Sequence, residues 1–451
     1  MNWGYFILRI VIALFILGAL FLSQRFWYRA IWRATANWPS TPLRVAARLL
    51  YVLAILLIVA TLVDGMRMGH HRRLIPRESL VAAFSGLWFT SALFGYLAVK
   101  IVAIFDRLWT FARRQPRVSN SSRSVAPQPA APLAAGAVPP EQLRDPSRRY
   151  FFRTATIAAG AAPFLGVMYG FAAERFRFII RRVEIPIANL PSQLDGLQIA
   201  QLSDIHLSSY MPRSEVRRAV DMANDLGADL AVVTGDFITG ANDPLADCID
   251  ELRQLHAPLG VWGCNGNHEI YAKAEDAAQS LFAQAGMRLL RHENAQLSFR
   301  GASFNLLGVD YQRERNLSGH RQPFLVGVEA LVRRDTPNIL LSHNPNSFNR
   351  AAELGIELSL AGHTHGGQVQ VEILDHRLSP ARFISDYVAG RYSRPLFAAA
   401  PDARDAGHQS LHLDPQSPQA QIYVNRGLGT VGAPVRLGVP PEITLLVLRR
   451  A

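Results

Sequence analysis

Cysteine and lysine are both scarce in this 451-residue chain. The two cysteines, Cys248 and Cys264, are too few for a disulfide framework, and no C-x-x-C pair predicts a thiolate zinc site. Both lie in apolar patterns, so we expect packed core thiols. Lysine occurs only at Lys100 and Lys273, so nearly all of the 47 basic residues are arginine. The cysteine count leaves the redox compartment open.

Long apolar runs dominate the first part of the chain. They extend from Tyr5 to Leu22, from Ala46 to Val63 and from Leu80 to Phe105, and each approaches or exceeds the ~20 residues that cross a bilayer as a helix. A formal net charge of +12 also suits nucleic-acid-binding proteins. Much of the excess charge flanks apolar runs, however, where a membrane topology signal explains it better. We therefore expect a membrane partner and no nucleic acid.

A proline- and alanine-rich segment from about residue 111 to 150 predicts a flexible linker. Near its end, the run S-R-R-Y-F-F from Ser147 to Phe152 resembles the core of a twin-arginine export signal. An apolar stretch follows from Thr154 to Ala173. The alternative is a basic flank before a fourth transmembrane helix. In both cases the arginines stay in the cytoplasm and the apolar stretch crosses the membrane. Because the cleavage site is weak, we expect this stretch to remain as an anchor.

Basic residues between the third and fourth apolar stretches predict the orientation of the chain. Nine arginines from Arg107 to Arg153 place this segment in the cytoplasm under the positive-inside rule. Four spans then put the N-terminus and the C-terminal domain outside, although the basic loop from Arg67 to Arg77 does not fit. The predicted organisation is 1–110 for three transmembrane helices, 111–150 for the linker, 151–180 for the twin-arginine-like motif and fourth transmembrane or anchor helix, and 181–451 for a folded domain.

From about Glu184, short apolar runs alternate with helical patterns. A helix is predicted to begin at Ser214 and to end at Gly227, and a second follows Asp243 and Pro244. The strand-like runs are 197–202, 230–233, 260–262, 305–307, 338–341 and 356–360. Alternating strands and helices predict an α/β layered domain.

Five of these six strand-like runs lead into metal-binding residue types. Residues two apart in an extended segment face the same side, so Asp204 and His206 can point at one ion. Gly235 lets the backbone approach closely beside a bridging carboxylate at Asp236. Because the carboxyl ends of strands in α/β sheets converge on one crevice, the blocks are expected to meet there. The remaining candidates are Asn267, His268, His343, His363 and His365.

In this order, the blocks D-x-H, G-D, G-N-H-[DE], a single His and G-H-x-H resemble the calcineurin-like metallophosphoesterases. The resemblance covers roughly Arg182 to Arg450 and is closest to membrane-associated bacterial phosphohydrolases of the YaeI and YkuE type, through the stretches 197–206 and 427–443. It implies a metallophosphoesterase β-sandwich with flanking helices in αββα layers. The resemblance says nothing about the first 180 residues. The predicted spans and the positive-inside rule, in contrast, predict a multi-pass protein of the bacterial inner membrane with a periplasmic catalytic domain.

The resemblance also implies roles for individual residues. Asp204, His206 and His365 would hold a first metal, Asn267, His343 and His363 a second, and Asp236 would bridge them. His268 would protonate the leaving oxygen, and Glu269 would orient its imidazole. Arg426 or Arg436, near a glycine-rich turn, would either contact substrate or be solvated surface charge.

These roles describe a metal-dependent phosphohydrolase that acts on a phosphodiester or a phosphomonoester. One class of expected substrates is phosphate esters derived from lipids or from the cell envelope. Two divalent ions ~3.5–4 Å apart neutralise the phosphate and convert a bridging water to hydroxide. Nitrogen and oxygen ligands suit Mn, Fe or Zn, with Mn favoured. One alternative is a lipid-precursor pyrophosphatase of the UDP-2,3-diacylglucosamine hydrolase type, with a cytoplasmic domain. Another is a non-catalytic sensor or transporter, although the apolar spans carry few of the intramembrane charges that a transport path needs.

Overall fold

The computed structural model describes residues 3–68, 76–112, 146–313, 322–373, 376–383, 385–396 and 418–451. Most of the predicted linker, residues 113–145, lies outside the described residues. The chain divides into two compact units, one formed by residues 1–57 and 85–167, the other by residues 58–84 and 168–451.

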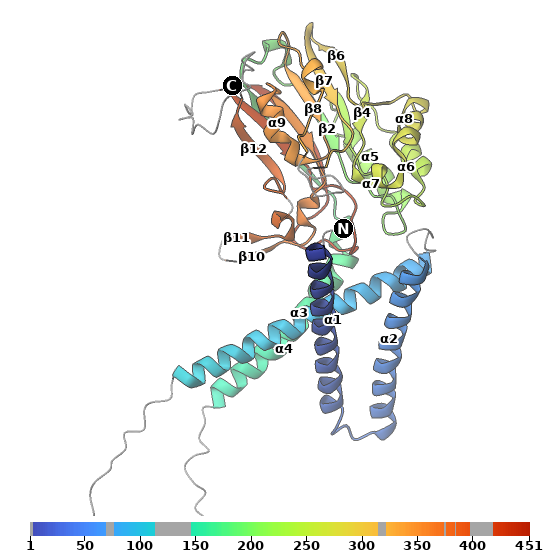
Figure 1. The fold of residues 1–451 in the computed structure, drawn as a ribbon, viewed down its shortest axis with the longest axis vertical. Coiled ribbons are helices and arrows are strands. Elements are labelled where there is room, and N and C mark those ends of the chain that lie inside the picture. Colours follow the sequence, from blue (N-terminus) through green and yellow to red (C-terminus); the bar gives the residue numbers. More distant parts are fainter. Residues whose placement is uncertain are drawn as a thin grey trace, which may run out of the picture. The chain divides into compact units, whose positions relative to one another are not determined.

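Four long helices fill the predicted membrane region (Figure 1). They are α1 (Trp3–Ala34), α2 (Thr41–Met68), α3 (Pro76–Ala112) and α4 (Pro146–Ala172). In the first unit, Trp27 of α1 donates to the Ala92 carbonyl of α3 at 2.8 Å, and its ring packs on Phe164 of α4. A Cβ on Gly95 of α3 would lie 2.8 Å from the Gly160 carbonyl oxygen of α4. Small residues therefore allow these backbones to approach closely, as in membrane helix pairs.

Three helices of the described chain are long and apolar enough to cross a membrane. Their apolar portions are Thr41–Ala60, Leu80–Ala112 and Ser147–Phe176. The predicted span from Tyr5 to Leu22 falls in α1, where the side chains of residues 3–10, 12 and 13 lie outside the described ones. α4 begins at Pro146, so the twin-arginine-like run is the first turns of a helix and not the end of a linker.

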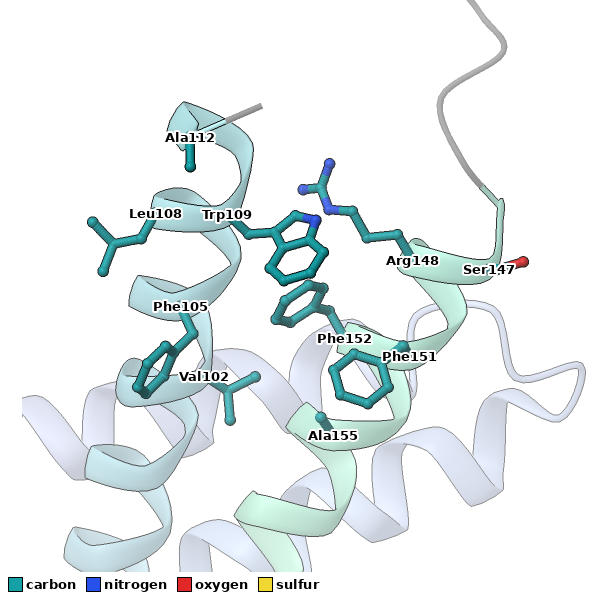
Figure 2. A pocket seen from close by; sticks show the side chains of 10 residues that line it. All are labelled: Val102, Phe105, Leu108, Trp109, Ala112, Ser147, Arg148, Phe151, Phe152 and Ala155. Atoms are coloured by element: carbon teal, nitrogen blue, oxygen red, sulfur yellow. The ribbon is translucent and has the colours of Figure 1, made fainter. Parts of the chain in front are cut away.

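A cavity of about 880 Å³ lies between the C-terminal end of α3 and the first turns of α4 (Figure 2). Phe105, Trp109 and Phe152 are among its mainly apolar lining residues. At its polar end, Arg148 of the twin-arginine-like run pairs with Asp106 at 2.5 Å and donates to the Thr110 hydroxyl at 2.7 Å. The two groups of side chains in the described residues that could hold a metal ion both lie in the second unit.

The second unit is built on two six-stranded sheets (Figure 1). The first has the order β1 (Ile179–Ile187), β14 (Glu442–Arg450), β2 (Gln198–Leu202), β3 (Leu230–Thr234), β4 (Val261–Cys264) and β5 (Arg288–Leu289). The second has the order β12 (Gly390–Pro395), β13 (Gln419–Val424), β9 (Leu358–Ala361), β8 (Asn338–Leu341), β7 (Ala302–Gly308) and β6 (Glu293–Phe299). A separate hairpin pairs β10 (Val371–Ile373) with β11 (His376–Leu378).

Apolar side chains from both sheets form one continuous core between them. Ile199 and Val232 of the first sheet belong to the same buried cluster as Leu306 and Leu358 of the second. The outer face of the first sheet packs on α5 (Arg213–Asn224), α6 (Leu245–Leu252) and α8 (Glu275–Gln284). The outer face of the second packs on α9 (Phe348–Glu353). The αββα layers predicted from the sequence are confirmed.

Parallel pairing brings the ends of the central strands together. β2, β3 and β4 are mutually parallel, as are β7, β8, β9 and β13. The short α7 (Asn267–Ala272) begins directly after β4. The 3-10 turns are Glu174–Phe176, Ser192–Leu194, Val328–Ala330, Pro345–Ser347, His365–Gly367 and Pro380–Phe383. Each predicted strand-like run overlaps an observed strand, and the loops that follow five of these strands carry the candidate site.

Candidate metal centre

The backbone at the strand ends is bent in an unusual way. Asp204, His206, Asp236, His363 and His365 all have left-handed backbone angles, with φ between 49° and 75°. Non-glycine residues rarely adopt this conformation, and where several do so together the surrounding structure holds them there for a function. Here it turns the side chains that follow β2, β3 and β9 into one buried space.

Four of the predicted ligands form a first cluster. The ligand atoms of Asp204, His206, Asp236 and His365 all lie within 4.8 Å of one another. His206 Nε2 is 3.2 Å from His365 Nε2 and 3.5 Å from Asp236 Oδ2, and His365 Nε2 is 3.4 Å from Asp204 Oδ1. Two imidazoles and two carboxylates facing one point are a typical donor set for a divalent transition metal.

A second cluster shares Asp236 with the first. Asp236, His343 and His363 again have ligand atoms within 4.8 Å of one another. His343 Nε2 lies 3.1 Å from Asp236 Oδ2 and 3.2 Å from Asn267 Oδ1, and His363 Nδ1 lies 2.7 Å from the same Asn267 oxygen. The structure therefore brings all seven predicted ligands together, with Asp236 in the position of a bridge.

The buried carboxylates of the two clusters are better explained by bound cations than by a site without metal. The side chains of Asp204 and Asp236 are buried together, although like charges in the interior repel. Asp204 Oδ2 has no hydrogen-bond partner within the described residues. A buried carboxylate oxygen without a partner is costly unless a cation occupies the space before it.

Backbone carbonyls fix the orientation of two imidazoles. His206 Nδ1 lies 3.1 Å from the Ile238 carbonyl, and His343 Nδ1 lies 2.7 Å from the Thr234 carbonyl. Because a carbonyl only accepts, Nδ1 carries the proton in both rings and Nε2 is left to face the cluster. This is how proteins set the tautomer of metal-binding histidines.

Burial also keeps most of these histidines neutral. It lowers the pKa of His206 to about 3 and that of His363 to about 4, so both present a lone pair at neutral pH. Burial would lower the pKa of His343 too, but the charge of Asp236 outweighs it and raises that pKa to about 10. For Asp236, burial opposes ionisation, yet contact with His343 holds its pKa well below the usual value. Without metal, this pair is therefore an ion pair.

His268 lies beside the clusters without belonging to either. Its ring centroid is 4.7 Å from that of His206, and its backbone N–H donates to Asp236 Oδ1 at 2.9 Å. His268 Nδ1 is 2.6 Å from the Thr239 carbonyl oxygen. Because the carbonyl only accepts, Nδ1 carries the proton and donates it to this bond. Nε2 has no hydrogen-bond partner among the described residues, so it is available to a bound substrate.

The expectation that Glu269 orients His268 is wrong. The Glu269 carboxylate is buried and accepts from backbone N–H groups instead. These belong to Asp236 (2.9 Å), Phe237 (2.8 Å), Ile238 (3.3 Å) and Gly266 (2.9 Å). The physical reason is that the tight turn at Asp236 leaves several donors without ladder partners, and one carboxylate satisfies them. Thr239 supplies the carbonyl that orients His268.

Gly235 is required by the close packing of this turn, as the sequence suggested. Its φ is 78°, and an added Cβ would lie 2.5 Å from Gly266 N and 2.9 Å from His343 Nδ1. Any larger residue here would push apart the loops that carry Asp236 and His343.

The expectation of solvated surface charge is wrong for both Arg426 and Arg436, and complete burial also removes Arg436 from substrate contact. Arg436 is fully buried, and its guanidinium donates to backbone carbonyls of Arg426, Gly427, Gly429 and Val439. Arg426 pairs with Glu442 at 3.3 Å. The loop that Arg436 holds in turn donates to the Asp204 carbonyl through Gly429 N at 2.7 Å.

Two further features bear on the site. Both cysteines are buried and free, as predicted, and burial raises the pKa of each thiol, so neither is a thiolate ligand.

Tyr311 follows β7, the one predicted strand without a ligand block, and its ring lies 5.4 Å from that of His363. Tyr311 is not among the residues predicted from the sequence, although its place after a sixth predicted strand was a usable signal.

Comparison with known proteins agrees with this geometry. The profile of the calcineurin-like phosphoesterase family matches residues 197–367. The chain is 31% identical over 284 residues to a bovine transmembrane protein with metallophosphoesterase domain, covering 60% of this chain and 57% of the relative. It is 29% identical over 314 residues to the metallophosphoesterase YkuE of Bacillus subtilis, covering 68% and 99%. It is 26% identical over 300 residues to the UDP-2,3-diacylglucosamine pyrophosphatase LpxG of Chlamydia trachomatis, covering 57% and 86%.

The chain spans little more than half the length of the bovine relative. Together with its three candidate spans, the transmembrane relatives indicate a membrane protein. The matched segment contains every ligand of both clusters. The matched segment, residues 197–367, therefore forms a calcineurin-like phosphoesterase domain that carries a possible metal-binding site.

Proposed function

We propose that this chain is a membrane-anchored phosphoesterase with two metal ions, which hydrolyses phosphodiester or phosphomonoester bonds. The observation that carries the proposal is the position of Asp236, whose carboxylate belongs to both ligand clusters. A shared carboxylate keeps two cations close together, which is the arrangement that phosphoester hydrolysis uses.

In this proposal, Asp204, His206, Asp236 and His365 hold one ion, and Asp236, Asn267, His343 and His363 hold the other. The bound ions supply charge neutralisation of the phosphate and lower the pKa of water. The nitrogen and oxygen donors suit Mn, Fe or Zn, and we favour Mn. Burial of the ligands excludes bulk water from the space around the ions.

His268 is the proposed general acid. The Thr239 carbonyl holds Nδ1–H, so the second proton of the imidazolium sits on Nε2, the atom without a described partner. That proton passes to the leaving oxygen as the ester bond breaks. A positioned acid of this kind contributes typically 10²–10⁴-fold to the rate.

The test is hydrolysis of bis-p-nitrophenyl phosphate and p-nitrophenyl phosphate by the full chain in detergent, with and without added Mn²⁺. His268→Ala should keep both metals and lose about 10²–10⁴-fold in kcat. Asp236→Asn should lose metal and activity together. His256→Ala, which changes an exposed histidine away from both clusters, is the matched control. A His268→Ala enzyme with undiminished kcat would remove the general acid from the mechanism.

The sidedness of the domain distinguishes two substrate classes. We propose a multi-pass protein of a bacterial inner membrane, with three helices in residues 1–110, a linker, a fourth helix in the region 151–180, and the catalytic domain from 181 on the periplasmic side. The likeness to LpxG favours a second candidate, a lipid-precursor pyrophosphatase. That candidate needs a cytoplasmic domain, because UDP-linked precursors are made there. A C-terminal alkaline phosphatase fusion is active only if the domain is outside, whereas a fluorescent protein that folds only in the cytoplasm reports the reverse.

A further inference from the structure

A cavity of about 530 Å³ adjoins the metal centre through one shared side chain. Tyr311 lines this cavity, and its ring centroid is also 5.4 Å from that of His363 and 6.1 Å from that of His343. A group that extends from a phosphate at the metal ions past the Tyr311 ring therefore enters the cavity directly. The calcineurin-like ligand blocks do not include this residue.

A second aromatic ring lies next to the same cavity. Tyr271 sits one turn after His268 in α7, and its ring is 6.0 Å from the His268 ring and 6.3 Å from the Tyr311 ring. It is 53% exposed, so part of its ring is open to a ligand. Arg313, which lines the cavity, places its guanidinium 4.7 Å from the centre of the Tyr271 ring.

The wall that carries Tyr311 is held firmly in place. On one side of it, Asp310 accepts from Asn265 at 2.8 Å and from Arg291 at 2.9 Å. On the other, Gln312 accepts from Leu325 N through its side chain at 2.7 Å and from Asn344 Nδ2 through its carbonyl at 2.9 Å. Side chains supported in this way bind a ligand without first having to be ordered.

The chemistry of the lining selects a class of ligand. Two tyrosine rings and a guanidinium offer faces and edges on which a planar ring can stack. Gln312, Arg313 and His292 make the lining half polar, which is unfavourable for a plain acyl chain. The positive charge of Arg313 at the cavity also favours an anionic group on the ring-bearing part of the ligand.

We propose that this cavity binds an aromatic or heteroaromatic ring on the alcohol side of the phosphate ester, stacked against Tyr271 and Tyr311 with Arg313 beside it. The inference rests on the proposed function, since the phosphate must sit at the metal centre. It narrows the substrate to ring-bearing phosphate esters.

The test compares two competitive inhibitors that differ in one ring. Adenosine 5′-monophosphate and ribose 5-phosphate share the phosphate and the sugar, and only the first carries a planar base. With bis-p-nitrophenyl phosphate as reporter and full-chain enzyme loaded with Mn²⁺, the adenosine compound should inhibit at least about tenfold more strongly, as expected for one stacked base. Tyr271→Leu should remove that advantage and leave the Ki of ribose 5-phosphate within about twofold of wild type, and Tyr271→Phe should restore it.

Phe299→Leu is the matched control, because Arg300 lies 4.7 Å over the Phe299 ring in the same kind of pair but at the far end of β6. It should leave both Ki values unchanged. Equal inhibition by the two compounds, or an advantage that survives in Tyr271→Leu, overturns the ring site while leaving the phosphoesterase proposal intact. A wild-type enzyme with no metal-dependent hydrolysis of the reporter overturns both.

Discussion

Arg436 allows a demanding test, because it is a buried cation that binds only carbonyl groups in the described contacts. Replacing it with Met keeps much of the volume and removes every donor. Three carbonyls, those of Arg426, Gly429 and Val439, then lose their described partner, whereas the Gly427 carbonyl still accepts from Glu442 N at 3.2 Å. At about 1 kcal/mol for each unsatisfied group, the free energy of unfolding should fall by about 3 kcal/mol. Relief of the buried charge offsets part of this, since Arg436 has its pKa lowered to about 10 by burial.

The loss should appear in metal binding as well. The loop that Arg436 holds donates from Leu428 N to the Ser203 carbonyl and from Gly429 N to the Asp204 carbonyl. When that loop loosens, Asp204 is no longer fixed, and Mn²⁺ affinity should fall at least about tenfold, as for other changes that disturb the support of metal ligands. Denaturant unfolding followed by circular dichroism gives the first quantity, and isothermal titration calorimetry gives the second.

Arg449→Met is the matched control. Arg449 lies on β14 and pairs with exposed Glu184 at 2.8 Å. A surface pair of this kind contributes about 0–1 kcal/mol, so the control should unfold near wild type and bind Mn²⁺ normally. If Arg436→Met behaves like Arg449→Met in both assays, the proposed role of Arg436 in holding the metal-site loop is refuted.

Three further predictions follow from the same contacts. Gly235→Ala should give a folded domain that binds little metal, because its Cβ would collide with Gly266 N; normal metal content by mass spectrometry would contradict this. Glu269→Gln replaces the carboxylate that accepts from four backbone N–H groups, so it should lower the free energy of unfolding by about 2–4 kcal/mol in denaturant titrations. An unchanged unfolding midpoint would show that these hydrogen bonds do not stabilise the turn. His343 has its pKa raised to about 10 in the metal-free protein, so metal must displace its proton. Mn²⁺ affinity should therefore rise about tenfold per pH unit between about pH 7 and 9, and calorimetry that shows no proton release would count against the His343–Asp236 ion pair.

The ligands were predictable because each one lies in a short motif at a strand end. Strand-like runs such as 338–341 are apolar and bounded by polar residues, and parallel strands bring their ends together whatever the loop lengths. The sequence alone therefore predicts that Asp204, Asp236 and His343 share one site.

Other parts of the site have no such local pattern. Glu269 and Arg436 act on backbone groups, and a side chain that bonds to a peptide N–H or carbonyl leaves no complementary residue type in the sequence. β1 pairs in parallel with β14 from the other end of the domain, through contacts that depend on the folded topology alone. Tyr271 and Tyr311 come together only because α7 and the end of β7 flank the same metal centre.

The central claim, that Asp236 joins two cations, is tested most directly by electron paramagnetic resonance of the full chain loaded with Mn²⁺. Two ions ~3.5–4 Å apart and bridged by one carboxylate should give an exchange-coupled signal at two Mn²⁺ per chain. Asp236→Asn should convert it to the signal of isolated Mn²⁺ or abolish it. Uncoupled Mn²⁺ in the wild-type protein, or a stoichiometry of one ion per chain, would contradict the account.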